Sequence, residues 1–349
     1  MSEPTIIFPA EWSPQDAVAI AFPHDQSDWS EILEQVIPVF TEIIVTISRY
    51  EKVLVICQEI SKVKELFPAE SRENILFFEI PANDTWARDF MPLTVLHDCN
   101  PVFFKYMFNG WGLKFPADLD NLIASKLYET GVFNQIPLIQ GGIVAEGGAF
   151  ESDGLGTLMS TTQCMLSPNR NPHLNLLQTE EILRKQLGIT NFLWLHHGYL
   201  AGDDTDSHID TLARFCSPDT IAYVSCEDKN DEHYTELKLM EDELRNFRQV
   251  DGRPYQLIAL PMAPACYDNT GMRLPATYAN FLIINGAVLL PVYGNPEKDN
   301  LAVEILAGCF WDREIIPVDC RMLTWQHGSL HCVTMQFPAG TLTPSHQVA

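Results

Sequence analysis

The sequence predicts an α/β protein made of about five similar units, each a helix with a few short strands, set radially around one central site. Stretches with amphipathic helical periodicity recur near residues 29–50, 118–131, 174–188, 232–249 and 298–310, and from the second onward they begin roughly 60 residues apart. Short apolar runs rich in β-branched and aromatic residues separate them, as is typical of strands. No G-x-G-x-x-G or G-x-x-x-x-G-K motif follows any run, so a nucleotide-binding parallel sheet is unsupported and radial repetition is favoured.

The strands expected from these apolar runs follow the chain in order. They are residues 17–22, 52–57, 74–80, 101–108, 191–195, 220–226, 255–260, 280–286 and 287–293. The best-defined helix is 118–131, where Asp118 can cap the first turn and Gly131 suits the end. Its apolar stripe consists of Leu119, Leu122, Ile123 and Leu127.

Length and charge limit the classes of protein that need to be considered. The 349 residues can bury a large core, and no linker or shift of composition divides them, so we expect a single domain over residues 1–349. The 46 acidic and 22 basic residues give a formal net charge of −24. Such a surface disfavours nucleic acid and anionic membranes as partners, and it concentrates small cations. The sequence leaves a homo-oligomer open.

The expected location is the cytoplasm. The first residues, MSEPTIIFPAEW, lack the basic and apolar segments of a signal peptide. No apolar run reaches the roughly 18 residues that a membrane span needs. Nine cysteines without regular C-x-x-C spacing argue against a disulfide framework and against a structural zinc site.

The densest polar segment is GDDTDSHIDTLARF, residues 202–215. Asp204, Asp206, His208 and Asp210 are spaced two apart, so in extended backbone they point to one face. Three interpretations remain open for this segment: a solvated loop, ligands for a hard divalent metal, or carboxylates that hold an organic cation while His208 moves protons.

Four other polar clusters follow apolar runs and are therefore expected at strand ends. Residues 81–92 contain Asp84, Asp89, Trp86 and Arg88, and residues 108–115 hold Trp111 between glycines. Glu146 precedes a pair of glycines, and His331 and Cys332 stand at the start of an expected alternating strand in residues 326–338. Each has an ordinary structural explanation: Glu146 as a turn residue, the tryptophans as core, Cys332 as a buried thiol. No role is assigned to His331.

Together these clusters supply a thiol, a histidine, carboxylates and indoles. Hydrolysis of an ester or amide needs donors for a developing oxyanion, whereas this set is almost entirely acceptors, which suit a cationic electrophile. Guanidinium is a natural candidate because it is planar, always charged and pairs bidentately with carboxylates. Indoles can stack on its face, and a thiolate is nucleophilic enough to attack its carbon.

The motifs NDTWARD, NGWG, EGG, SPNRNP, DDTDSHID and the late HC resemble the agmatine deiminase family of the guanidino-modifying (pentein) superfamily, a family that also includes bacterial-type peptidylarginine deiminases. The resemblance runs from residue 8 to Cys332. It implies a five-bladed α/β propeller with a central site that uses no metal and no cofactor. It also implies hydrolysis of agmatine to N-carbamoylputrescine and ammonia, a step of polyamine synthesis, by a single catalytic domain.

The resemblance also implies a role for each site residue. Cys332 would be the nucleophile that forms an amidino-cysteine, His208 the general acid and base, and Glu146 the residue that orients and charges the imidazole. Asp89 and Asp210 would hold the guanidinium nitrogens. The remaining expected substrate contacts are Trp86 and Trp111 along the alkyl chain and Asp204 at the distal ammonium.

Three departures from the family pattern reshape the channel without removing a catalytic group. Phe90-Met91-Pro92 replaces the usual Thr-Gly-Pro or Tyr-Gly-Pro, Ser207 stands where glycine is common, and GSLH precedes the cysteine where GNIH is frequent. The alternatives are deimination of peptidylarginine or free arginine, for which Arg88 or Arg170 could bind the carboxylate, amidino transfer to an amine, and polyamine binding without catalysis.

Overall fold

The computed structural model describes residues 5–344 and 346 of the chain. Across these residues the backbone repeats one motif, in which two antiparallel strands are followed by a helix and by a third strand parallel to the second. In one such unit, β5 (Leu93–His97) and β6 (Asn100–Met107) precede α5 (Asp120–Glu129) and β7 (Leu138–Val144). The register sets Leu93 opposite Phe104, and Phe103 opposite Leu138.

Three more units repeat this order along the described chain. They are β8 (Glu151–Ser152), β9 (Thr157–Thr161), α7 (Leu176–Leu187) and β10 (Asn191–Leu195); β11 (Ala213–Ser217), β12 (Thr220–Val224), α8 (Tyr234–Asn246) and β13 (Gln256–Leu260); and β16 (Leu282–Ile284), β17 (Ala287–Val292), α9 (Pro296–Cys309) and β18 (Glu314–Asp319). In each unit the helix connects the two parallel strands, as a parallel pair requires.

The remaining unit joins two distant parts of the chain. The late strand β19 (Met335–Pro338) pairs antiparallel with β2 (Gln15–Ala21), and β3 (Lys52–Cys57) and β4 (Ile75–Glu79) extend the sheet in parallel. Helix α1 (Leu33–Ile47) links β2 to β3, and α2 (Ile60–Glu65) links β3 to β4. The smaller elements are β1 (Ile6–Ile7), α3 (Ala87–Phe90), α4 (Gly110–Leu113), α6 (Thr162–Met165), the hairpin of β14 (Cys266–Tyr267) with β15 (Arg273–Leu274), and the 3-10 turns η1 (Ser30–Ile32), η2 (Ser71–Asn74), η3 (Gly147–Ala149), η4 (Ile209–Thr211) and η5 (Leu323–Gln326).

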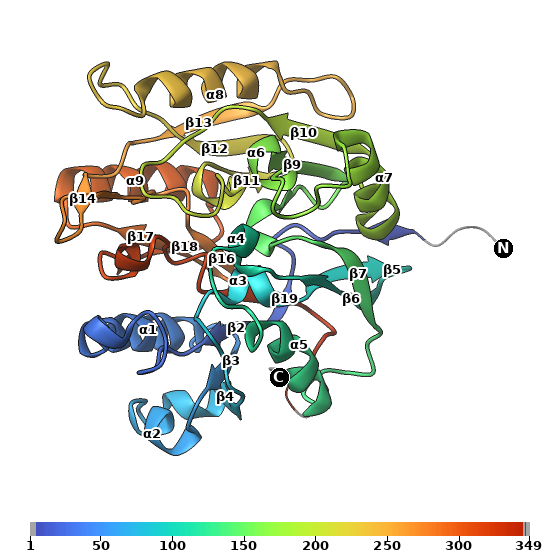
Figure 1. Ribbon diagram of the computed structural model, residues 1–349, viewed down its shortest axis with the longest axis vertical. Coiled ribbons are helices and arrows are strands. Elements are labelled where there is room, and N and C mark those ends of the chain that lie inside the picture. The colour runs from blue at the N-terminus through green and yellow to red at the C-terminus, as the bar shows by residue number, and fades with distance from the viewer. Residues whose placement is uncertain (1–4, 345, 347–349) are drawn as a thin grey trace.

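The protein is therefore α/β with several small sheets. Figure 1 shows the long helices α1, α9, α8 and α7 toward the outside, whereas the short helices α3 and α4 lie near the middle of the view. The main core packs the sheets against their helices, and a smaller core lies between α8 and strands β10 to β13. Among the described residues, no helix combines the length and the apolar character that crossing a membrane requires.

The predicted helices and strands are confirmed in position, with ends that shift by a few residues. The prediction that Asp118 caps α5 was wrong. The helix begins at Asp120, and its free N–H groups are satisfied from another segment: Asn83 Oδ1 accepts from the backbone N–H of Leu119 at 2.7 Å and of Asp120 at 3.1 Å. Leu122, placed in the apolar stripe, is 45% exposed. Five strands of four or more residues, β5, β7, β9, β11 and β18, were not predicted, because they are short or carry glycine, proline or polar residues.

Candidate active site

Four of the eight predicted site residues occupy the same place in their units, just before the first strand. Asp89 precedes β5, Glu146 precedes β8, Asp210 precedes β11, and Cys332 precedes β19. The equivalent position before β16 holds Asn280, which the sequence analysis did not single out. Residues far apart in the sequence thus meet because each unit contributes one polar turn.

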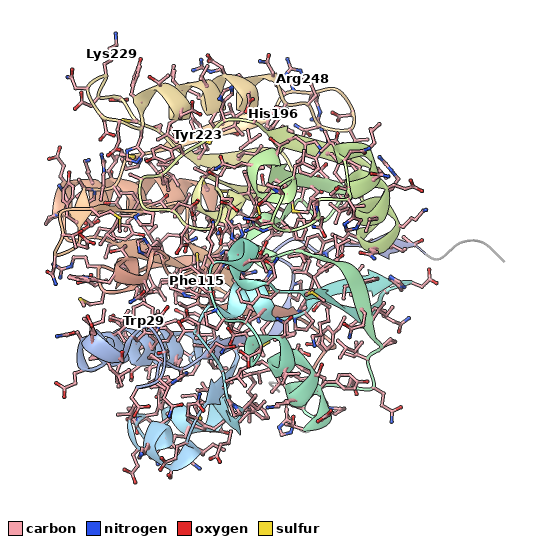
Figure 2. All side chains as sticks on the ribbon, in the orientation of Figure 1. Trp29, Phe115, His196, Tyr223, Lys229 and Arg248 are labelled. Atoms are coloured by element: carbon pink, nitrogen blue, oxygen red, sulfur yellow. The ribbon has the colours of Figure 1, made fainter. Side chains whose placement is uncertain are left out.

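A cavity brings five of the predicted residues together. Its lining is Asp28, Asp84, Trp86, Asp89, Trp111, Phe115, Asp204, Thr205, Thr211, Gln326, His327, Gly328 and Cys332. Figure 2 shows Phe115, one of these residues, near the middle of the view, whereas Lys229 and Arg248 lie toward the outer edge. The other three predicted residues, Glu146, His208 and Asp210, are buried: His208 contacts Asp89 and Asp210 contacts Cys332 in the lining, whereas Glu146 lies behind them against His208.

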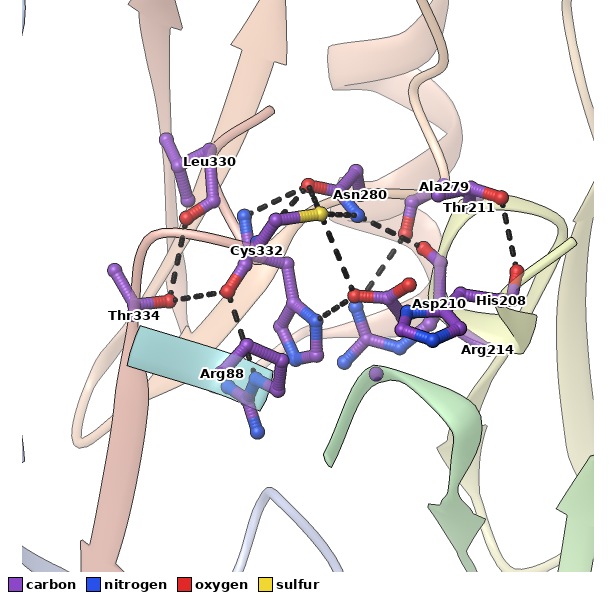
Figure 3. A network of polar contacts seen from close by, with 12 residues as sticks. Arg88, His208, Asp210, Thr211, Arg214, Ala279, Asn280, Leu330, Cys332 and Thr334 are labelled. Carbon is purple, nitrogen blue, oxygen red and sulfur yellow. Dashed lines mark hydrogen bonds and ion pairs between the residues drawn. The ribbon is translucent and has the colours of Figure 1, made fainter. Parts of the chain in front are cut away.

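Cys332 is held in place by Asn280. The Asn280 Oδ1 atom accepts from the backbone N–H of His331 at 2.9 Å and of Cys332 at 3.3 Å, and its Nδ2 lies 3.2 Å from the thiol sulfur. Figure 3 shows the sulfur between Asn280 and Asp210, whose Oδ2 is 3.7 Å away. Burial, with the negative charges of Asp210 and Asp89, raises the pKa of Cys332 well above its usual range. The resting thiol is therefore protonated. The expected strand at 326–338 begins only at Met335, so Cys332 lies on the turn before it.

Asp89 lies in a close-packed pocket on α3. Its Oδ2 accepts from Trp111 Nε1 and its Oδ1 accepts from the backbone N–H of Gly148, both at 2.9 Å. A Cβ on Gly148 would lie 2.6 Å from His208 Nδ1 and 2.9 Å from Asp89 Oδ1, so only glycine fits here. Burial raises the pKa of Asp89, opposed by the charge of His208.

His208 lies between two buried carboxylates. Its Nδ1 is 3.7 Å from Asp89 Oδ1, and its Nε2 is 3.8 Å from Glu146 Oε2. Burial lowers the pKa of His208, but the charge of Asp89 and the contacts with Cys164 and Glu146 outweigh it and raise the pKa well above 6.5. The imidazole is therefore protonated at neutral pH, and it can donate a proton.

Glu146 is kept ionised beside that imidazole. Both of its oxygens accept from Arg170 Nε, at 2.9 and 3.0 Å, and neither side chain is exposed. Burial raises the pKa of Glu146, but His208 and Arg170 together lower it below its usual value. Glu146, Cys164 and His208 are close enough to share a metal ion, but the Arg170 guanidinium already occupies both carboxylate oxygens.

The acidic segment 203–210 is not extended, so the expectation that its side chains share one face was wrong. Asp206 and Ser207 have φ values of 66° and 63°, and η4 follows at once, so the chain turns instead of alternating. Asp206 is thereby directed to Lys114 and Arg170, whereas Asp204 lines the cavity and His208 and Asp210 reach its buried end. Glycine adopts this left-handed backbone freely, which fits its frequency in the family at the position of Ser207.

Asp210 has one free oxygen. Its Oδ2 lies 2.7 Å from His331 Nδ1, whereas Oδ1 is buried without a hydrogen-bond partner among the described residues. Burial raises the pKa of Asp210, but its hydrogen bond to His331 and the charges of His331, His208 and Arg214 lower it below the usual value. In the sequence, the only signal that pointed to His331 was its position directly before Cys332.

The two tryptophans line the cavity, whereas the two arginines do not. Trp86 packs against Gly328, where a Cβ would lie 2.3 Å from its ring, and Trp111 exposes one edge to the cavity beside Asp89. Arg88 and Arg170 are not in the cavity wall. Arg170 is bound to Glu146 and Asp206, and Arg88 lies 3.8 Å from Glu11 on the other side of Cys332. Neither arginine is available to a carboxylate in the cavity.

Comparisons with known proteins agree with the motifs. A family model described as Porphyromonas-type peptidyl-arginine deiminase matches residues 7–338. A Porphyromonas gingivalis structure, provisionally described as an arginine deiminase, is 49% identical with a TM-score of 0.93, over 97% of this chain and 100% of that one. An agmatine deiminase of C. jejuni with substrate bound is 35% identical with a TM-score of 0.90, over 97% of both chains. A Vibrio parahaemolyticus protein, provisionally named agmatine deiminase, is 32% identical over 95% of this chain and 96% of its own. The chain therefore belongs to the Porphyromonas-type peptidyl-arginine deiminase family.

Proposed function

We propose that this protein hydrolyses agmatine to N-carbamoylputrescine and ammonia through a covalent amidino-cysteine intermediate. The observation that carries the proposal is the cavity itself, in which a thiol lies among buried carboxylates while the outer wall carries further aspartates and no arginine or lysine. Relatives named agmatine deiminase support the reaction, and so does the position of each polar turn. We further propose that the five units are the blades of a propeller, that the site lies on its axis, and that residues 1–349 act as one catalytic domain.

In this proposal the guanidinium binds between Asp89 and Asp210, which we call the clamp. A guanidinium presents several N–H donors in one plane, and the unpartnered Oδ1 of Asp210 is an acceptor without a donor. Trp86 and Trp111 line the path of the alkyl chain. Binding adds a positive charge beside Cys332, which offsets the two carboxylates that hold its pKa high. The thiol then loses its proton to solvent, so the substrate itself helps to activate the nucleophile.

The first half of the reaction forms a bond from Cys332 Sγ to the guanidinium carbon. The protonated His208 gives its proton to one amino group, the C–N bond breaks, and ammonia leaves with a thiouronium still attached to the enzyme. Glu146 and Asp89 favour the proton on His208 before this step. General acid catalysis of this kind contributes about 10²–10⁴-fold to rate.

In the second half of the reaction the same imidazole acts as a base instead of an acid. His208, now neutral, takes a proton from water as the oxygen attacks the same carbon. The C–S bond then breaks, the thiolate leaves, and the product is a urea. His208 keeps the first proton of the water and is an imidazolium again, whereas the second proton of the same oxygen passes to ammonia, so the products are N-carbamoylputrescine and ammonium. The thiolate regains its proton from solvent when the product leaves.

The charges along the cavity favour a cationic tail over a carboxylate. The acidic lining residues are Asp28, Asp84, Asp89 and Asp204, and His327 is the one basic side chain of the wall. Burial raises the pKa of Asp84 to about 8, so Asp84 is mostly neutral at pH 7 and the negative charge of the wall rests on the other aspartates. Burial and the neighbouring Asp203 raise the pKa of Asp204 to about 6, so it is ionised at neutral pH and can receive the distal ammonium. Free arginine would place its carboxylate near these acids. We therefore expect arginine and arginine-ended peptides to be poor substrates.

Incubation of the purified protein with agmatine, free arginine and an arginine-ended peptide, each without added metal, tests the assignment by mass spectrometry. We expect a gain of about one mass unit on agmatine, with release of ammonia, and no change in the other two. Conversion of the peptide or of arginine would move the assignment to peptidylarginine or arginine deimination. Transfer to an added amine would identify an amidinotransferase, and agmatine binding without conversion would leave a binding protein.

Asp89→Asn is expected to weaken binding and turnover together. It removes one negative charge of the clamp, and the single amide oxygen can accept from only one of the two donors that Asp89 serves, Trp111 Nε1 and the backbone N–H of Gly148. Loss of a charge-assisted hydrogen bond of about 1.5–3 kcal/mol lowers kcat/KM for agmatine by about 10- to 100-fold. Steady-state ammonia release provides the measurement. Asp242→Asn on the exposed face of α8 serves as a control. Normal kinetics in the Asp89 variant would remove this residue from the site.

A further inference from the structure

Behind the clamp, six charged side chains form a buried cluster that we call the ionic cluster. None is more than 9% exposed, and they come from segments far apart in the sequence. The acidic members are Glu11, Glu151 and Asp210, and the basic members are Arg88, Arg214 and His331. Of the six, Asp210 alone is also part of the clamp. The state of the cluster therefore bears directly on substrate binding.

His331 is the link between the cluster and the clamp. Its Nδ1 lies 2.7 Å from Asp210 Oδ2 and its Nε2 lies 2.7 Å from Glu11 Oε2. A neutral imidazole carries one N–H, so it can donate to only one of these carboxylates. Both contacts are hydrogen bonds when the ring carries two protons and both carboxylates are ionised. At 2.7 Å the two contacts have the length of charge-assisted hydrogen bonds.

The charge balance of the cluster also indicates that His331 is protonated. Arg214 donates Nη2 to Glu11 at 2.9 Å and Nε to Glu151, and Arg88 Nη2 lies 3.8 Å from Glu11. With His331 protonated, three negative and three positive charges balance. With a neutral ring and all three carboxylates ionised, the cluster would carry a net negative charge, which is costly for side chains of which none is more than 9% exposed.

We propose that His331 is a positioning residue, held as an imidazolium between Glu11 and Asp210, which keeps Asp210 ionised and turns its free Oδ1 toward the guanidinium. The proposal deepens and rests on the function proposed above. His331 does not touch the substrate. It occupies Oδ2, so the free oxygen of Asp210 is always the one available to the substrate. Asn280 fixes the same turn by accepting from the backbone N–H of His331, so ring and nucleophile are placed together.

The groups around Asp210 and His331 determine how loss of the positive charge on His331 would affect Asp210. Asp210 is faced by Cys332, His208, Arg214 and the nearby Asp89, and Arg88 Nε lies 3.5 Å from the carbonyl of His331. His331 supplies the largest contribution that lowers the pKa of Asp210. Without it, burial dominates, and Asp210 takes up a proton at higher pH. It then joins Asp89, whose pKa burial already raises, as a second carboxyl that must lose its proton before substrate binds.

His331→Asn is the test, because an asparagine Nδ2 can still donate to Asp210 but carries no charge. We expect KM for agmatine to rise about tenfold with a smaller change in kcat. We also expect the acid limb of log kcat/KM against pH to steepen from a slope near one toward two, as a second carboxyl titrates.

His233→Asn is the matched control. His233 is as buried as His331, is 2.6 Å from Asp231, and is not in the ionic cluster. A merely structural role lowers the active fraction equally at every pH, so an unchanged slope and KM in the His331 variant would overturn the proposal.

The ring protons can be observed without any turnover. In protein labelled with ¹⁵N-histidine, long-range ¹H–¹⁵N spectra should show both nitrogens of His331 protonated throughout the neutral range, with the signal assigned by its loss in the His331 variant. Glu11→Gln keeps an acceptor for Nε2 and removes one of the two carboxylates that hold the imidazolium, so the variant should show a smaller share of rings with both nitrogens protonated. A ring with one bare nitrogen at neutral pH would overturn the proposal. Failure of the wild type to turn over agmatine would refute the proposed function instead, and the spectrum would still decide the state of His331.

Discussion

Cys332→Ala is expected to abolish agmatine turnover and to leave agmatine binding nearly unchanged. The substitution removes the atom that forms the covalent bond, and loss of a nucleophile that acts together with its acid and base costs more than about 10⁴-fold in kcat. Binding persists because the clamp is made by Asp89 and Asp210, and because a protonated thiol contributes no charge to the resting site. Ammonia release measures the first effect, and calorimetric titration with agmatine measures the second.

A haloacetamidine provides a direct control for this prediction. It resembles a guanidinium and carries a leaving group, so it should alkylate Cys332 faster than the other eight cysteines, and agmatine should slow that reaction. Cys99 is exposed and does not line the cavity, so its labelling should not change with agmatine, and Cys99→Ala should keep full activity. Residual turnover in the Cys332 variant, or labelling that agmatine does not slow, would contradict the assignment.

His208→Asn is expected to lower kcat by about 10²–10⁴-fold, because the variant has no group to protonate the departing ammonia. The pH dependence gives a sharper criterion. The pKa of His208 is raised in the wild type, so its imidazolium is present below that pKa and is lost as pH rises through it. The wild-type kcat should therefore fall on the alkaline side, and that fall should be absent from the variant. His196→Asn, at an exposed histidine, should keep the wild-type profile. A variant with the alkaline fall intact would assign it to another group.

Local patterns were enough to predict the helices and most of the longer strands. In the helix expected at 118–131 and the strand expected at 52–57, the order of apolar and polar residues along the chain is enough to predict the element. The candidate site residues were identifiable because each belongs to a short motif. The structure places seven of the eight in or against one cavity, and Glu146 directly behind His208. The propeller arrangement and the role of each residue stay predictions.

Other features of the site depend on contacts that no local pattern contains. His331 gains its importance from Asp210, 121 residues earlier, and from Glu11, 320 residues earlier. Asn280 reads as the first residue of an apolar run, yet it holds the turn of Cys332. The alternation of acids in 203–210 misled because two consecutive residues, Asp206 and Ser207, adopt positive φ, which period-two reasoning cannot foresee.

The pairing of β19 with β2 has a consequence for how the protein is made. The first sheet receives its edge strand only when Met335 pairs opposite Ala19, and the turn before that strand carries Cys332. Both follow every other site residue in the chain, so the ribosome synthesises them last among these groups. Until residues 332–338 are synthesised, the nascent chain contains the acids and the imidazole of the site but not the Cys332 thiol, and its first sheet lacks the edge strand β19. Covalent chemistry thus becomes available only when the two distant parts of the chain meet.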